Sequence, residues 1–150
     1  MRLVIQRVCE ASVEVLKEKI AQIGKGMLIF VGIENGDSDG DADWLANKII
    51  NMRIFPDEEN VMNLSIKDIN GAILAISQFT LTASTKKGNR PSYIRAARPE
   101  DALPLYNKFC DLLSEKLGDQ VKKGIFGADM KVSLINDGPV TIIIDSKLKE

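Results

Sequence analysis

The stretch from residue 27 to residue 33, MLIFVGI, is the strongest constraint that this sequence places on its own fold. It contains no charged side chain, and a short continuous apolar run of this kind is typical of a strand buried on both faces of a sheet. A central strand needs neighbours on both edges, and other apolar or alternating segments can supply them. We therefore expect a buried sheet whose strands lie at residues 3–8, 11–16, 27–33 and 72–83.

Two segments show the spacing of an amphipathic helix. After a turn-forming cluster at residues 35–40, apolar side chains recur every three or four residues, which predicts a helix at residues 39–53. A second helix is expected to begin at Pro99, because proline suits the first turn and acidic residues follow it. Gly118 is its expected stop. Its apolar stripe indicates a face packed in the core.

The C-terminal region contains two more apolar segments, residues 131–135 and 140–144. The intervening NDGP, residues 136–139, is a typical turn sequence, because Asp-Gly adopts positive φ at little cost. Taken alone, it predicts a hairpin. No repeat, linker or low-complexity tract interrupts the 150 residues, of which 45% are apolar and 27% charged. The expected fold is a single α+β domain, residues 1–150, with a mostly antiparallel or mixed β-sheet.

The absence of histidine excludes more chemistry than any other feature of the composition. Without His, the chain cannot form Ser-His-Asp or Cys-His nucleophiles, histidine bases or histidine-containing zinc sites. The two cysteines, Cys9 and Cys110, cannot make a four-thiolate metal site. We expect both to be reduced and buried by packing, with a disulfide between them as the open alternative. No export signal or apolar run of about 20 residues is visible, so a cytoplasmic protein is expected.

One segment has an uneven charge distribution. The chain has 20 basic and 21 acidic residues, yet no Asp or Glu occurs from residue 69 to residue 99. An ordinary solvated loop is one interpretation of this segment. The other is a patch that binds the phosphates of a nucleic acid, with Tyr93 available to stack on a base. The candidate phosphate-binding cations are Lys86, Lys87, Arg90, Arg95 and Arg98.

The sequence SQFTLTAST, residues 77–85, leads into this basic run. On a strand, Gln78, Thr80, Thr82 and Ser84 would share one face. That pattern is compatible with a plain strand surface rich in threonine. It is also compatible with the floor of a site in which backbone N–H groups stabilise an oxyanion. Thr80 could act as a nucleophile only with a base, and no histidine is available.

Two motifs occur together in this chain, SQFTLTA at residues 77–83 and NDGPVT at residues 136–141, along with LVIQRV at residues 3–8 and RPSY at residues 90–93. With this combination the chain closely resembles the D-aminoacyl-tRNA deacylase (D-tyrosyl-tRNA(Tyr) deacylase) family from Met1 to Asp145. The resemblance implies a cytoplasmic homodimer with a barrel-like core and two main helices. It also implies a carboxylic ester hydrolase that releases D-amino acids, or glycine mischarged on tRNA, from the terminal adenosine. No cofactor and no metal are implied.

The resemblance assigns roles to particular residues. The site is expected at the dimer interface. The bond between Gly138 and Pro139 is expected to be cis, and this pair enters the partner's pocket, where it rejects L-amino acids. Arg7 matches a position that braces the Gly-Pro turn. The expected catalytic residues are Ser77, Gln78, Phe79 and Thr80.

Two other functions are compatible with the same residues. A non-catalytic RNA-binding module would use the basic run alone. A structural homo-oligomer would explain the apolar strands without any site. Turnover of a D-aminoacyl-tRNA by catalytic amounts of protein separates the enzyme from both.

Overall fold

β3, Gly26–Gly32, is the central strand of the computed structural model, which describes residues 1–149. It pairs antiparallel with β1 on one edge and parallel with β6 on the other. Six of its seven residues are buried, so the predicted central strand is confirmed. The other strands of this sheet are β1 (Arg2–Val15), β2 (Glu18–Ile23), β6 (Ala72–Ser77), β7 (Val121–Lys123) and β8 (Lys131–Asp145).

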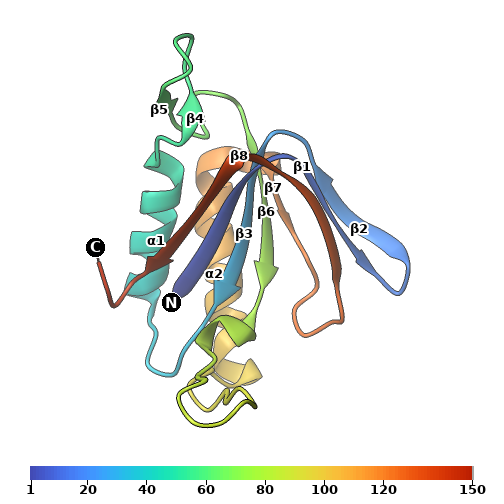
Figure 1. Cartoon of the computed structure of the whole chain (residues 1–150), viewed down its shortest axis with the longest axis vertical. Helices are drawn as coiled ribbons and strands as arrows, with labels where there is room; N and C mark the ends of the chain where they lie inside the picture. The colour runs from blue at the N-terminus through green and yellow to red at the C-terminus, as the bar shows by residue number, and fades with distance from the viewer. Residues whose placement is uncertain (150) are drawn as a thin grey trace.

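The sheet is mixed and strongly curled (Figure 1). β1 pairs antiparallel with β2, β3 and β8, whereas β3, β6 and β7 run parallel. Because β2 also lies against β6 and β7, the sheet is nearly closed as a barrel. A small separate hairpin, β4 (Phe55–Pro56) and β5 (Met62–Leu64), stands beyond the end of α1. Inside the curl lies a cluster of buried apolar residues: Val8, Ala11, Val13, Ile23, Leu28, Leu74 and Ile76.

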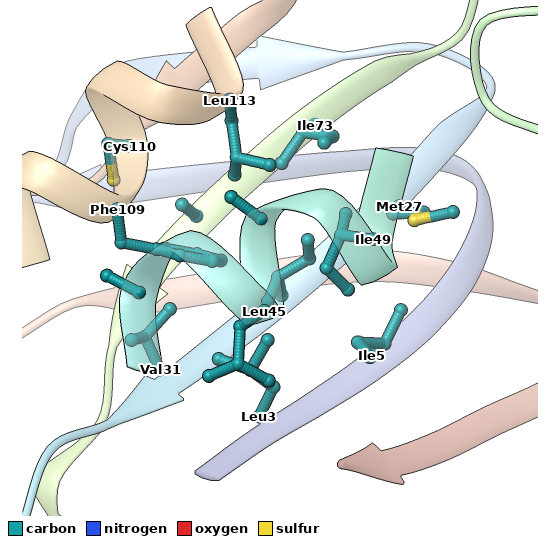
Figure 2. Packing of buried hydrophobic residues seen from close by; sticks show 14 of the residues in the cluster. Leu3, Ile5, Met27, Val31, Leu45, Ile49, Ile73, Phe109, Cys110 and Leu113 are labelled. Atoms are coloured by element: carbon teal, nitrogen blue, oxygen red, sulfur yellow. The ribbon is translucent and has the colours of Figure 1, made fainter. Parts of the chain in front are cut away.

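Two helices, α1 (Asp39–Asn51) and α2 (Pro99–Leu117), pack against each other and cover the other face of the sheet (Figure 1). Both helices were predicted from the sequence, and Gly118 ends α2 with a φ of +60°. The hydroxyl of Tyr106 on α2 donates to the carbonyl of Ala75 on β6 at 2.9 Å. Figure 2 shows the apolar side chains that join the helices to the sheet, among them Leu3, Ile5, Val31, Leu45, Ile49, Phe109 and Leu113.

The N-terminal strands differ from the prediction. Residues 3–8 and 11–16 are not two strands, because β1 runs unbroken from Arg2 to Val15 and absorbs its irregularities as register shifts. β2 was not predicted at all. The turn before it consists of Leu16 and Lys17, with φ of 51° and 68°. Neither residue is a usual occupant of this left-handed conformation, so the sequence carried no turn signal there.

The predicted C-terminal hairpin is also wrong. Residues 131–135 and 140–144 belong to one strand, β8, and both halves pair with β1 instead of with each other. Between the pairs Val8–Asn136 and Gln6–Thr141, two steps along β1 match five steps along β8. The NDGP sequence therefore forms a bulge on a continuous strand. β1 is long enough to supply a partner for both halves, which removes the need for a hairpin.

The two cysteines lie in different surroundings. Cys110 is buried on α2, as predicted, and burial raises the pKa of its thiol to about 11. Cys9 is exposed on β1, so the prediction that it is buried is wrong. It lies where the pairing of β1 with β8 shifts register, which turns the side chain outward. Both thiols are free. Within residues 1–149, no helix has the length and apolar character of a membrane span.

The start of α1 generates a prediction about acid stability. The carboxylate of Asp41 accepts hydrogen bonds at 2.8 Å from both the backbone N–H and the hydroxyl of Ser38. Partial burial raises the pKa of Asp41, but hydrogen bonds from Ser146 and Ser38 outweigh it and bring the pKa to about 2. The pKa of an aspartate in an unfolded chain is about 3.9. The stabilisation is therefore complete above that pH and is lost as the pH falls through about 2.

We expect Asp41→Asn to lower the free energy of unfolding by about 1 kcal/mol at pH 7 and to have little effect near pH 2. Urea unfolding at the two pH values measures the difference. Asp43→Asn, at an exposed acid on the same helix, is the control. An equal loss of unfolding free energy in the two variants at pH 7 would contradict a specific role for the hydrogen bonds between Asp41 and Ser38.

Candidate active site

A cavity of about 540 Å³ opens where β3 and β6 end. Its walls come from these strands, from η1 (Phe79–Thr82), from the start of α2 and from the loop at residues 126–130. Asp129 is the one charged side chain that lines it among residues 1–149, and Asp129 is exposed and ion-paired with Lys131 at 3.0 Å. The rest of the lining is mainly apolar and includes Val31, Ile33, Ile76, Phe126, Met130 and Val132.

Three of the four predicted catalytic residues line this cavity, at the point where the chain leaves β6 for a turn. β6 ends at Ser77, and the N–H of Gln78 donates to the carbonyl of Val31 at 2.8 Å as the chain leaves the sheet. The chain then enters the 3-10 helix η1. The predicted strand through residue 83 is therefore wrong. Of the four candidates, the cavity is lined by Ser77, Gln78 and Phe79.

The predicted shared strand face is wrong, because the chain forms η1 here and side chains two residues apart no longer point the same way. This face was expected to hold Gln78, Thr80, Thr82 and Ser84. Thr82 is fully buried, whereas Ser84 lies in the loop that follows. Gln78 and Thr80 remain neighbours, since the Nε2 of Gln78 donates to the Oγ1 of Thr80 at 2.5 Å. The amide of Gln78 is neutral and cannot take the proton of Thr80.

Two backbone donors are free at the start of η1. The N–H groups of Phe79 and Thr80 have no acceptor in the part of the chain that the structure describes. The first N–H groups of a helix have no partner within the helix, so they are available to a ligand. Phe79 lines the cavity. Two adjacent N–H donors at a mainly apolar cavity are suited to stabilise an oxygen atom that gains negative charge.

Gly32 allows η1 to pack directly on the end of β3, and the sequence analysis did not identify it. A Cβ at this position would lie 2.8 Å from the Cβ of Leu81 and 3.2 Å from the carbonyl oxygen of Gln78. Both atoms belong to the turn that carries the free amides. The only signal in the sequence was a glycine that interrupts an otherwise apolar strand, which is typical of a close backbone approach.

The cations of the basic run do not all have the same surroundings. In residues 1–149, Lys86, Lys87 and Arg90 are exposed and form no ion pair. Arg95 is engaged, because its Nε and Nη2 donate to the carbonyl of Thr82 at 3.3 and 3.1 Å. Arg98 precedes α2 and lies 3.9 Å from the carboxylate of Glu100, with both side chains exposed. Three of the five cations are therefore fully available to phosphate.

The basic loop lies beside the cavity through an aromatic contact. The ring of Tyr93 meets the ring of Phe79 edge to face, with 5.0 Å between the centroids. The loop is closed at its base by reciprocal hydrogen bonds between Ser84 and Ser92, each 2.9 Å. An aromatic pair is thus exposed between the cavity and the free cations.

Gly138 and Pro139 form the exposed tip of the bulge in β8. Their peptide bond is cis, as the resemblance implies, and Gly138 has a φ of +116°. The Nε of Arg7 forms an ion pair with Asp137 at 2.9 Å, and the amide of Asn136 donates across the bulge to the carbonyls of Arg7 and Val140 at 2.9 and 3.0 Å. The ion pair with Arg7 and the hydrogen bonds of Asn136 therefore hold the Gly138–Pro139 tip in place.

The fold does not bring this tip to the cavity of the same chain. Arg7, which contacts the tip, pairs with Met27, whereas Ser77 at the cavity pairs with Val31. At a rise of about 3.3 Å per residue, these positions are about 13 Å apart along β3. The SQFTLTA and NDGPVT motifs therefore lie in different places on one chain.

A second cavity of about 590 Å³ lies between the starts of the two helices. Its acidic side chains are Glu34, Asp37, Asp39, Glu100 and Asp101, and Lys108 is the base among its lining residues. This lining repels phosphate and offers none of the predicted catalytic residues. The candidate active site is therefore the cavity at the end of β6.

Comparison with known proteins gives a consistent result. The family model described as D-Tyr-tRNA(Tyr) deacylase matches residues 4–145. A curated protein from Flavobacterium psychrophilum named D-aminoacyl-tRNA deacylase is 64% identical over 150 residues, which cover the whole of both chains. A solved structure titled c-Myc DNA Unwinding Element Binding Protein is 39% identical with a TM-score of 0.92, covering 97% of this chain and 98% of its own. A probable eukaryotic D-amino acid tRNA deacylase, 17% identical with a TM-score of 0.82 over 95% and 97% of the two chains, shares the fold.

The packing of η1 on β3 predicts that Gly32→Ala disturbs the candidate site. The added methyl group must displace Leu81 and Gln78, so we expect a loss of about 1–3 kcal/mol in unfolding free energy. Amide resonances of residues 78–82 should shift together in the NMR spectrum. Gly24→Ala is the matched control, because a Cβ there has no atom within 4 Å. Unchanged resonances in the Gly32 variant would show that η1 does not depend on this contact.

Proposed function

The chain belongs to the D-Tyr-tRNA(Tyr) deacylase family, and we propose that it hydrolyses the ester between a D-amino acid, or glycine mischarged on tRNA, and the terminal adenosine of tRNA. The products are the free amino acid and tRNA, so the reaction is chiral proofreading in translation quality control. The observation that carries this proposal is the pair of adjacent free N–H groups of Phe79, which lines the cavity, and of Thr80, the next residue. We propose residues 1–150 as one deacylase domain acting in the cytoplasm, where its substrate is used.

The proposed chemistry is assigned mainly to the backbone. Water attacks the ester carbonyl carbon, the carbonyl oxygen becomes an oxyanion, and the N–H groups of Phe79 and Thr80 stabilise it. The bond to the ribose oxygen then breaks, and that oxygen takes the proton that the attacking water gives up. One such donor is worth about 3–4 kcal/mol in the transition state. The vicinal ribose hydroxyl of the substrate assists, which suits a chain without histidine. Ser77 and Gln78 shape the edge of the site, and Thr80 acts through its N–H, not its hydroxyl.

We also propose a homodimer with the site at its interface. Gly138 and Pro139 are exposed and lie about 13 Å along the sheet from the cavity of their own protomer. A second copy of the chain is the natural source of this tip. β8 has a free edge among the described residues and presents Ile135 and Ile143 exposed, which suits contact with a partner.

Rejection of L-amino acids is assigned to the same tip. Enantiomers differ in the direction of the Cβ, so a rigid wall near the α-carbon separates them better than mobile side chains do. The tip is held by the Arg7–Asp137 ion pair and by Asn136. Backbone atoms of Gly138 and Pro139 would exclude an L-Cβ and leave a D-side chain free to project outward.

The basic loop is the proposed contact with tRNA. Lys86, Lys87 and Arg90 replace counterions of the phosphate backbone. Arg98 can add to this contact because it is exposed. Arg95 contributes less, since its guanidinium is occupied by the carbonyl of Thr82.

The test of the function is turnover. Incubation of catalytic amounts of the protein with matched D- and L-aminoacyl-tRNA should release the D-amino acid over many turnovers and the L-amino acid at least about 100-fold more slowly. Release of labelled amino acid measures both rates. Binding of tRNA without turnover would instead support the non-catalytic RNA-binding module.

The dimer makes a separate prediction about mixed protomers. Pro139→Arg enlarges the tip, and Ala128→Trp fills the cavity that Ala128 lines; each variant alone should be inactive. After the two are unfolded together and refolded, random pairing gives about a quarter of the wild-type activity, because half of the dimers hold one intact site. Gly24→Ala in place of either partner is the control. Failure of mixed dimers to regain activity, or a fully active 16.5 kDa monomer in light scattering, would contradict the shared site.

A further inference from the structure

The side chain of Thr82 contacts the peptide group that carries one of the two amides that the proposed reaction uses. Thr82 is fully buried, and its hydroxyl donates to the carbonyl oxygen of Phe79 at 2.8 Å. That carbonyl belongs to the same peptide group as the N–H of Thr80. A hydrogen bond accepted by the oxygen of a peptide group strengthens the N–H of the same group as a donor, because hydrogen bonds in a chain polarise one another.

The neighbouring amide has an equivalent bond from the backbone. The N–H of Leu81 donates to the carbonyl oxygen of Gln78 at 3.2 Å. This carbonyl shares its peptide group with the N–H of Phe79. Both free amides are therefore polarised from behind: the Phe79 amide by the main chain, and the Thr80 amide by the Thr82 hydroxyl in addition to the main-chain bonding of η1 itself. The side chain is the part that a substitution can remove.

Arg2 holds the turn in place from β1. Its Nη1 donates to the carbonyl of Leu81 at 3.0 Å, while its Nε and Nη2 bind the carboxylate of Asp145 at 3.1 and 2.8 Å. The last carbonyl groups of a helix receive no hydrogen bond from within the helix, and the contact with Arg2 supplies one of them with a donor. Arg95 satisfies the next, that of Thr82. The planar guanidinium of Arg2 reaches a carboxylate and a carbonyl at once, which a lysine ammonium cannot do in the same geometry.

We propose that Thr82 is a positioning residue for deacylation, whose buried hydroxyl aims and polarises the N–H of Thr80, and that Arg2 keeps this turn in register through the carbonyl of Leu81. The inference rests on the proposed function for its kinetic consequence. Its physical content, a stronger Thr80 donor in the free protein, does not depend on that function.

The decisive comparison is Thr82→Val against Thr82→Ser. Valine keeps the shape of threonine and removes the hydroxyl, whereas serine keeps the hydroxyl. Thr82→Val should lower kcat for D-aminoacyl-tRNA about tenfold with KM unchanged, and Thr82→Ser should stay within about twofold of the wild type. Ser114→Ala is the matched control, because Ser114 also donates its hydroxyl to a carbonyl, that of Cys110 on α2 at 3.0 Å, away from the site; its kcat should not change.

A spectroscopic readout separates this inference from the proposed function. In Thr82→Val, the amide proton of Thr80 should move upfield relative to the wild type and to Thr82→Ser, while that of Phe79 stays in place. If wild-type protein shows no turnover, the proposed function fails, and the Thr80 amide shift alone decides the inference. An unchanged Thr80 resonance, or equal kcat losses for the valine and serine variants, would overturn it.

Arg2→Lys gives an independent test at a half-exposed position, should Thr82→Val fold poorly. It retains a cation for Asp145 but loses the second contact with Leu81, so kcat should fall severalfold at unchanged KM, with a shift of the resonances of residues 79–82. Full kcat with unshifted resonances would remove Arg2 from the proposal.

Discussion

The pairing of β3 on both edges is the constraint on which the rest of the molecule depends. β6 at one end of β3 and the turn that contains η1 at the other approach so closely that each end requires a glycine. A Cβ on Gly26 would collide with the carbonyl oxygen of Ala72, and one on Gly32 would press on Leu81 and Gln78. The first glycine allows β6 to begin beside β3, and the second allows the chain to fold over the end of β3 after β6 stops. The sheet core and the candidate site are thus built by the same strand.

Several elements could be predicted from the sequence because their signals are local. The apolar run of β3, the periodicity of α1 and the Pro99 and Gly118 boundaries of α2 each lie within the element that they describe. The errors have a common physical cause, which is pairing between distant segments. NDGP resembles a hairpin turn, but β1 is long enough to hold both halves of β8. Strand-forming residues follow Ser77, but the chain leaves the sheet there and packs as η1 on Gly32.

The candidate site divides in the same way. Motif residues such as Phe79, Gly138 and Pro139 were identified from the sequence and the family that it resembles, and the structure adds their surroundings. Arg7, which supports the Gly138–Pro139 tip, was named through the resemblance. The supports of η1 were not identified, because Arg2 and Gly32 become neighbours of η1 only after β1, β3 and β6 have assembled. Thr82 was seen only as one of several hydroxyls on an expected strand, and its burial reverses that interpretation. A pattern of side chains cannot reveal which backbone groups remain without partners.

A site whose donors belong to the main chain also responds differently to substitutions that accumulate in the sequence. Any residue other than proline at positions 79 and 80 still carries an N–H, so substitution of these residues leaves the donor itself in place. Selection then acts on what holds the peptide groups in position, and harmful substitutions should gather at the supports. A diverging copy of this chain could keep its sequence motif and yet lose its reaction through a change on β1 or at the end of β3. Inheritance of the motif and inheritance of the activity are, in this architecture, separable events.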